Sequence, residues 1–127
     1  MAEKMDIDLQ PGYLGVSMQG AFHLGRLKGF LKEVVEASRS HACSKVFVDM
    51  TKVEGRIPIV DRFLIGQHLS DLRPGGIRLA LVVDEAQVEG ARFLEKVATN
   101  RGVLLKVTAD PEEAWQWLGV CPKGHAG

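Results

Sequence analysis

Cysteine, clustered basic residues and long apolar runs are all scarce in this chain of 127 residues. The only two cysteines, Cys43 and Cys121, form no C-x-x-C pair, so neither a disulfide framework nor a thiolate zinc site is indicated. No two basic residues are adjacent, and 16 Lys and Arg balance 16 Asp and Glu, which argues against a nucleic-acid partner. The longest apolar run, from Leu79 to Val83, cannot span a bilayer, and the first residues include carboxylates where a signal peptide would be apolar. We therefore expect a cytoplasmic protein with free thiols, no nucleic-acid partner and no membrane insertion.

Motifs that bind metals or nucleotides are also missing. The four histidines show none of the spacings that bring two imidazoles to one metal. Gly20 and Gly25 have the spacing of the glycines in a phosphate-binding loop. However, Arg26 and Leu27 stand where that loop needs a lysine and a hydroxyl group. We therefore expect no cofactor, no metal and no nucleotide hydrolysis.

Apolar periodicity and turn residues predict alternating strands and helices. A short hairpin is expected around Pro11 and Gly12, because apolar alternation lies on both sides of this turn. The predicted strands cover residues 13–20, 45–49, 77–83 and 103–107, and the predicted helices cover residues 23–39, 58–72 and 89–101, followed by a short helix that Asp110 caps. Gly102 is expected to end the third helix in the left-handed conformation.

Strands that alternate with helices favour right-handed crossovers and a largely parallel sheet. The predicted fold is therefore a single-domain α/β sandwich, with a mostly parallel sheet of about four or five strands, an N-terminal hairpin and about four helices. Residues 1–120 are expected to form this domain, and the glycine-rich residues 121–127 a flexible tail.

Aspartates follow three of the predicted strands. Asp49, Asp84 and Asp110 all lie at carboxyl ends, where open parallel sheets collect their ligands. The alternative is that each carboxylate accepts backbone N–H bonds in its own turn, as is expected for Asp110. An acid/base pair of Asp49 and Asp84 would need both side chains at one rim of the sheet.

The second predicted helix carries more apolar residues than one buried stripe needs. Ile59, Phe63, Ile65 and Leu69 are among residues that cover more than one face. A second apolar face can be buried by self-association, by an apolar ligand or by neighbouring parts of the chain.

Several of these stretches resemble one family. They are Lys45–Thr51, the helix around Asp61–Phe63, the strand Ile77–Val83, and the closing run from Arg92 through Gly102 to Leu118. Together they resemble the STAS-like domains, in the branch similar to the sporulation anti-sigma-factor antagonist. The resemblance implies an α/β fold and a function in protein docking.

The resemblance also implies a phosphorylatable serine at the start of the helix after the second long strand. Residues 53–58 occupy that place here and contain no hydroxyl group. Thr51 fits the small residue that follows the strand-end aspartate in this family, so Asp49 is the site residue carried over from it.

The leading hypothesis is a non-enzymatic STAS-like regulatory module that binds other proteins and forms a homodimer. Its partner or ligand surface is predicted to include Asp49, Thr51, Gly55, Arg56, Ile59, Arg62 and Phe63. The alternative is a carrier or sensor of a small apolar or lipid-like ligand, which requires an apolar pocket beneath the second or third helix.

Overall fold

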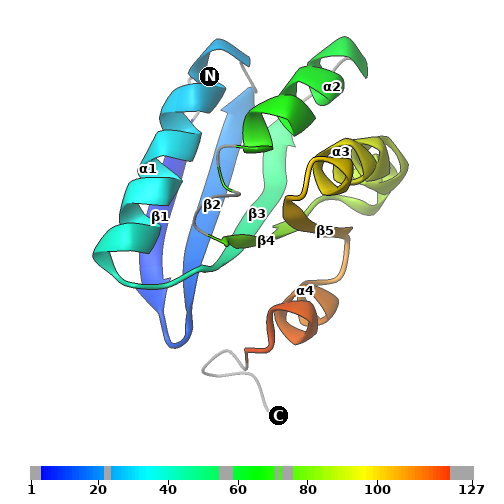
Figure 1. The fold of residues 1–127 in the computed structure, drawn as a ribbon. Coiled ribbons are helices and arrows are strands. Elements are labelled where there is room, and N and C mark those ends of the chain that lie inside the picture. Colours follow the sequence, from blue (N-terminus) through cyan, green and yellow to red (C-terminus); the bar gives the residue numbers. More distant parts are fainter. Residues whose placement is uncertain (1–3, 22–23, 55–58, 71, 73–75, 121–127) are drawn as a thin grey trace.

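A computed structural model describes residues 4–21, 24–54, 59–70, 72 and 76–120. Strands and helices alternate along most of the chain, as the sequence predicts (Figure 1). The elements are β1 (Lys4–Gln10), β2 (Tyr13–Ala21), η1 (Leu24–Arg26), α1 (Leu27–Ser40), β3 (Lys45–Glu54), α2 (Ile59–His68), β4 (Arg78–Val82), η3 (Glu85–Gln87), α3 (Val88–Asn100), β5 (Leu104–Thr108) and α4 (Pro111–Leu118).

The five strands form one sheet in the order β1-β2-β3-β4-β5. β1 and β2 are antiparallel and joined by a tight turn in which Gly12 has a φ of 84°, a conformation that favours glycine. The other neighbouring pairs are parallel. The predicted fold class, a mostly parallel sheet opened by a hairpin, is therefore confirmed.

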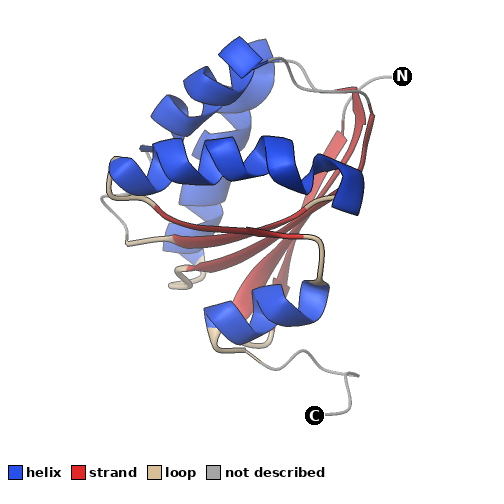
Figure 2. Cartoon of the chain, turned by 90° about the vertical axis from the view of Figure 1, so that its right-hand side faces the viewer, coloured by secondary structure: helices blue, strands red, loops and turns tan. Residues whose placement is uncertain are grey.

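Helices cover the two faces of the sheet unequally (Figure 2). Each crossover from β2 to β5 moves one strand in the same direction, so right-handed connections place α1, α2 and α3 on one face. We call this the three-helix face. α4 follows the last strand and packs on the opposite face, the α4 face, against β3, β4 and β5.

Alternating strand residues supply the core on both faces. On the three-helix face, Leu14, Val46 and Val107 are fully buried together with the inner sides of α1 and α3. On the α4 face, a smaller cluster contains Ala80, Val82, Ala114 and Leu118. The Phe47 ring stacks on Trp115 of α4, with centroids 5.1 Å apart.

Local signals placed the ends of the last two helices correctly. The Asp110 carboxylate accepts the Glu112 N–H at 3.0 Å, so the predicted cap of α4 is confirmed. Gly102 has a φ of 83° directly after α3, as predicted. Gly119 ends α4 in the same left-handed region.

The buried phenol of Tyr13 gives the fold a dependence on alkaline pH. Burial raises the pKa of Tyr13 above its usual 10.0, and the nearby Trp115 side chain offsets part of this effect. The folded state therefore keeps the phenol neutral at a pH where the unfolded chain ionises. The sign follows from proton binding: the unfolded state holds fewer protons above pH 10, so stability is lost as pH rises from there toward the folded-state pKa.

We expect the free energy of unfolding to fall more steeply above about pH 10 in the native chain than in a Tyr13→Phe variant. Urea unfolding of both proteins across this range measures the difference. Tyr13 is the only tyrosine, so tyrosinate absorbance reports its ionisation without interference from another residue of that type. A stability difference that stays constant with pH would contradict this linkage.

Candidate functional site

A bulge in β3 brings Asp49 and Thr51 together. Ser17 pairs with Asp49 and Gln19 pairs with Lys52, so β3 contains one residue more than β2 between these pairs. Asp49 Oδ1 accepts the Thr51 backbone N–H at 2.9 Å and the Thr51 hydroxyl at 2.6 Å. The carboxylate is therefore engaged by its own turn, which fixes the backbone of the bulge.

The prediction that the second long strand ends at Asp49 is wrong, because β3 continues to Glu54. Asp49 is the last residue of β3 to pair with β4, opposite Val82. Beyond the bulge, β3 pairs with β2 alone, up to the pair of Glu54 with Ala21. β3 and β4 thus separate at their carboxyl ends, on the side where α2 lies (Figure 1).

The three strand-end aspartates do not form one group. Asp49 lies opposite Val82, which belongs to the α4-face cluster, whereas Asp84 lines a cavity on the three-helix face. Asp110 caps α4. Because Asp49 and Asp84 lie on opposite faces of the sheet, the structure does not bring them together as an acid/base pair.

The remaining residues of the predicted surface lie in or next to α2. Gly55 and Arg56 are outside the described residues, and Ile59 and Arg62 belong to α2 without described side chains. Phe63 is 42% exposed, and the Arg101 guanidinium lies 5.9 Å from the centre of its ring.

The apolar excess of α2 is explained in large part by packing within the chain. Ile65 is buried against the sheet, and Leu69 is buried directly after the helix. Gly66 faces α3 so closely that an added Cβ would lie 2.5 Å from Cγ1 of Val97. α2 therefore buries one side against the core that covers the sheet and another side against α3. Phe63 stays exposed.

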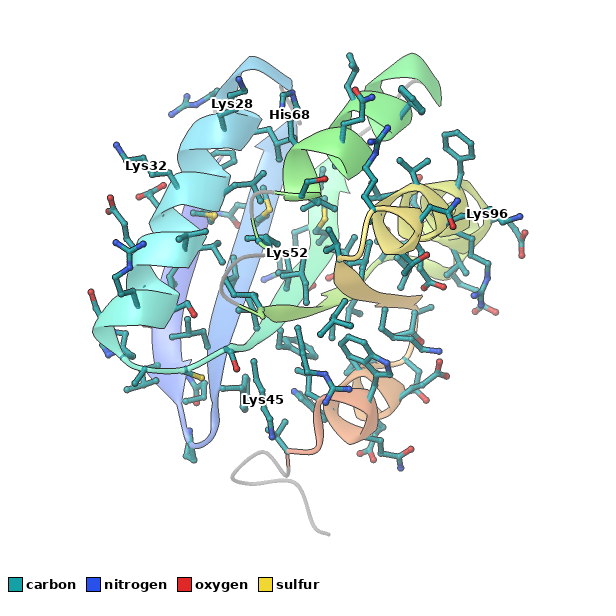
Figure 3. All side chains as sticks on the ribbon, viewed as in Figure 1. Lys28, Lys32, Lys45, Lys52, His68 and Lys96 are labelled. Atoms are coloured by element: carbon teal, nitrogen blue, oxygen red, sulfur yellow. The ribbon has the colours of Figure 1, made fainter. Side chains whose placement is uncertain are left out.

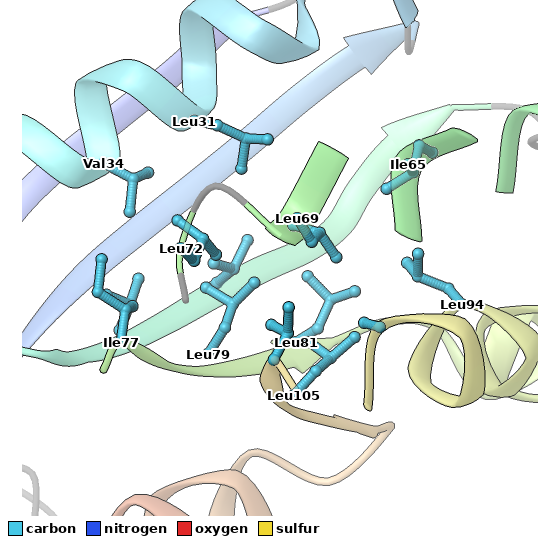
Figure 4. Close-up of a cluster of buried hydrophobic side chains, with 14 of the residues drawn as sticks. Leu31, Val34, Ile65, Leu69, Leu72, Ile77, Leu79, Leu81, Leu94 and Leu105 are labelled. Atoms are coloured by element: carbon cyan, nitrogen blue, oxygen red, sulfur yellow. The ribbon is translucent and has the colours of Figure 1, made fainter. Parts of the chain in front are cut away.

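An apolar cavity of about 110 Å³ lies between the sheet and the three helices of the three-helix face. Leu31 from α1, Leu69 after α2 and Leu94 from α3 converge above Leu79 and Leu81 of β4 (Figure 4). Among the described residues that line this cavity, all are apolar except Asp84 and Gln87. Its volume is smaller than the cavity of about 150 Å³ that holds benzene in an engineered protein. The space thus suits one narrow apolar group.

Sequence reasoning missed the methionines that line this cavity. Met5, Met18 and Met50 come from three neighbouring strands, and all three are half-buried there. They are all the methionines of the chain apart from Met1. Methionine is flexible and polarisable and adapts to ligands of irregular shape. Only Met18 lies within a predicted strand (residues 13–20), so the predicted elements did not bring the three methionines together.

Within the described ranges, no group of three or more His, Cys, Asp or Glu side chains could hold a metal ion. In the same part of the chain, no helix combines the length and the hydropathy needed to cross a bilayer.

The fold has known counterparts among solved structures. One is an anti-sigma factor antagonist from Mycobacterium paratuberculosis, with a TM-score of 0.59, 14% identity, and coverage of 93% of this chain and 95% of that one. Another is an uncharacterised protein of the DUF3478 family from Shewanella loihica PV-4, which has a SpoIIAA-like fold, with a TM-score of 0.54, 17% identity and coverage of 91% and 93%. This chain has the STAS-like fold.

An NMR structure of the protein TM1081 shares this STAS-like fold, with a TM-score of 0.57, 16% identity, and coverage of 89% of this chain and 86% of that one. No family model and no curated protein matches the sequence. The structural likeness extends over nearly the full length in each comparison, which agrees with the resemblance drawn from the closing helix, strand and helix.

Proposed function

We propose that this chain is a non-enzymatic regulatory module that acts in the cytoplasm by docking to another protein through α2 and the segment that precedes it. The observation that carries the proposal is the agreement of its STAS-like fold, over nearly the whole chain, with an anti-sigma factor antagonist. Among the described residues no cluster that could hold a metal accompanies the Asp49 carboxylate, which is engaged by the Thr51 backbone N–H and hydroxyl.

The exposed part of α2 has the chemistry of an interface. The aromatic ring of Phe63 in α2 and the guanidinium of Arg101, the residue after α3, lie together there. Aromatic residues and arginine are enriched at protein interfaces and supply much of their binding energy. We name the pair the α2 surface, and we propose that it also supports a homodimer.

Docking at this surface is proposed to be independent of phosphorylation at the usual place. Residues 53–58 have no hydroxyl group, so they cannot carry a phosphate ester on serine or threonine. The nearest hydroxyl, on Thr51, donates its hydrogen to Asp49 within the bulge. Phosphorylation of Thr51 would remove this hydrogen bond, which helps to fix the turn, and would also add charge.

A Phe63→Glu variant tests the α2 surface. We expect native mass spectrometry to show a dimer for the native chain and a monomer for this variant, because a carboxylate buried at an interface core costs several kcal/mol without a partner (roughly 3–5 kcal/mol). Leu9→Glu is the matched control, since Leu9 is also exposed but lies on β1. It should remain a dimer.

The native chain, Phe63→Glu and Leu9→Glu, each used as bait in a pull-down, test whether a regulatory partner docks at the α2 surface. A partner that docks at the α2 surface should be retained by the native chain and by Leu9→Glu, and lost with Phe63→Glu. A native chain that is monomeric at every concentration would refute the homodimer, and partners retained equally by all three would refute this docking surface.

The cavity favours a second function, a carrier or sensor of a small apolar ligand. Its apolar lining with few polar groups is the lining usual for a small-molecule site. Native mass spectrometry of the protein purified under gentle conditions, followed by denaturation, tests this function. Release of a small apolar compound would support the carrier. A ligand-free chain that also binds none of a set of short-chain alkyl compounds would refute it.

A further inference from the structure

The cavity has a polar end formed by the connection from β4 to α3. Asp84 precedes η3, and Gln87 is its last residue. The Gln87 backbone N–H donates to the Asp84 carbonyl oxygen at 2.8 Å, which closes a tight turn between them. Both residues line the cavity, and no other polar residue does so among those the structure describes.

Asp84 differs from the other two strand-end aspartates in the hydrogen bonding of its carboxylate. The carboxylates of Asp49 and Asp110 each accept a backbone N–H from their own turn. Asp84 stands at the same kind of position, before η3, but its side chain makes no capping hydrogen bond. Asp84 is exposed, so among the described residues no protein donor holds its carboxylate, which lies in solvent at the edge of the apolar space.

The negative charge of Asp84 at this end of the cavity favours some ligand head groups over others. A carboxylate repels an anionic head and attracts an ammonium group, and it accepts a hydrogen bond from a hydroxyl group. Lys28 and Lys32 do not reverse this preference, because they point away from the sheet on the outer side of α1 (Figure 3) and do not line the cavity. The Gln87 amide can donate or accept and so fits either kind of head.

The apolar part of the ligand is limited by the size and lining of the cavity. A volume of about 110 Å³ leaves room for a short alkyl chain and not for a long one or for a lipid with two chains. The half-buried Met5, Met18 and Met50 can change rotamer to follow such a chain.

We propose that the cavity binds a single-chain amphiphile whose head is an ammonium or another hydrogen-bond donor, and that Asp84 selects this head over a carboxylate. This inference rests on the carrier or sensor function proposed above. It adds the chemical class of the ligand and the residue that chooses it.

Isothermal titration calorimetry with butylamine, butanol and butyrate at neutral pH tests the proposal. We expect butylamine to bind at least about tenfold more tightly than butyrate, because the head changes from an attracted to a repelled charge. An Asp84→Asn variant should reduce this ratio to about threefold or less, mainly by improving the binding of butyrate. Butanol should bind both proteins with similar affinity.

Glu85→Gln is the matched control. Glu85 is the next residue, is exposed and does not line the cavity, so this variant removes the same charge without touching the site. It should keep the preference of the native chain. If butyrate binds as tightly as butylamine, or if Asp84→Asn and Glu85→Gln change the ratio equally, the role of Asp84 is refuted while the carrier stands. If none of the three compounds binds, the carrier function is refuted as well.

Discussion

Replacing Gly66 with alanine should lower the free energy of unfolding by about 1 kcal/mol, although alanine normally strengthens a helix. The added Cβ would lie 2.5 Å from Cγ1 and 2.8 Å from Cβ of Val97. Valine has a stiff χ1 on its own helix, so relief requires α2 and α3 to move apart. Overpacking of this kind costs about 1–3 kcal/mol, and the gain in helix propensity of up to about 1 kcal/mol offsets only part of it.

Gly29→Ala is the matched control, because Gly29 lies in α1 with nothing within 4 Å of an added Cβ. It should raise the free energy of unfolding by about 0.5–1 kcal/mol. A Val97→Ala substitution should rescue Gly66→Ala, with a coupling of about 0.5–3 kcal/mol in a double-mutant cycle followed by urea unfolding. If alanine changed the free energy of unfolding equally at Gly66 and at Gly29, α2 and α3 would not be held as close together as the contact of Gly66 with Val97 requires.

The features that the sequence predicts well are those set by neighbours in the chain. Asp110 places the start of α4 and Gly102 marks the end of α3, because caps and turns depend on a few adjacent residues. The continuous apolar run from Leu79 to Val83 indicates a strand buried on both faces, and β4 is such a strand.

Features that depend on pairing and packing between distant residues were not predicted. β3 runs past Asp49 because a bulge keeps its outer half paired with β2, and the residues around Asp49 do not specify that partner. The close contact of Gly66 with Val97 and the cavity both depend on how α2 sits between α1 and α3. Hydrophobic periodicity shows which side of a helix is buried, but it does not show whether the buried sides fill the space between them.

The cavity itself can be tested by filling it. Ala91 of α3 is half-buried and lines the cavity, so leucine at this position places three more carbon atoms toward the empty space. We expect Ala91→Leu to reduce the affinity for butylamine and butanol by at least about tenfold, because it takes the volume that the alkyl chain needs. The free energy of unfolding should stay the same or rise by about 0.5–2 kcal/mol, as is common when a cavity is filled.

Two other variants separate cavity filling from a general effect on the fold. Ala86→Leu adds the same side chain at an exposed position of η3 that does not line the cavity, so it should leave ligand affinity unchanged. Leu31→Ala enlarges the cavity and should cost about 2–5 kcal/mol of stability, part of which a bound alkyl compound restores. Unchanged binding in Ala91→Leu would place the ligand elsewhere. Loss of binding together with unchanged or higher stability would instead show that this space holds the apolar chain, since no unfolding could account for the loss.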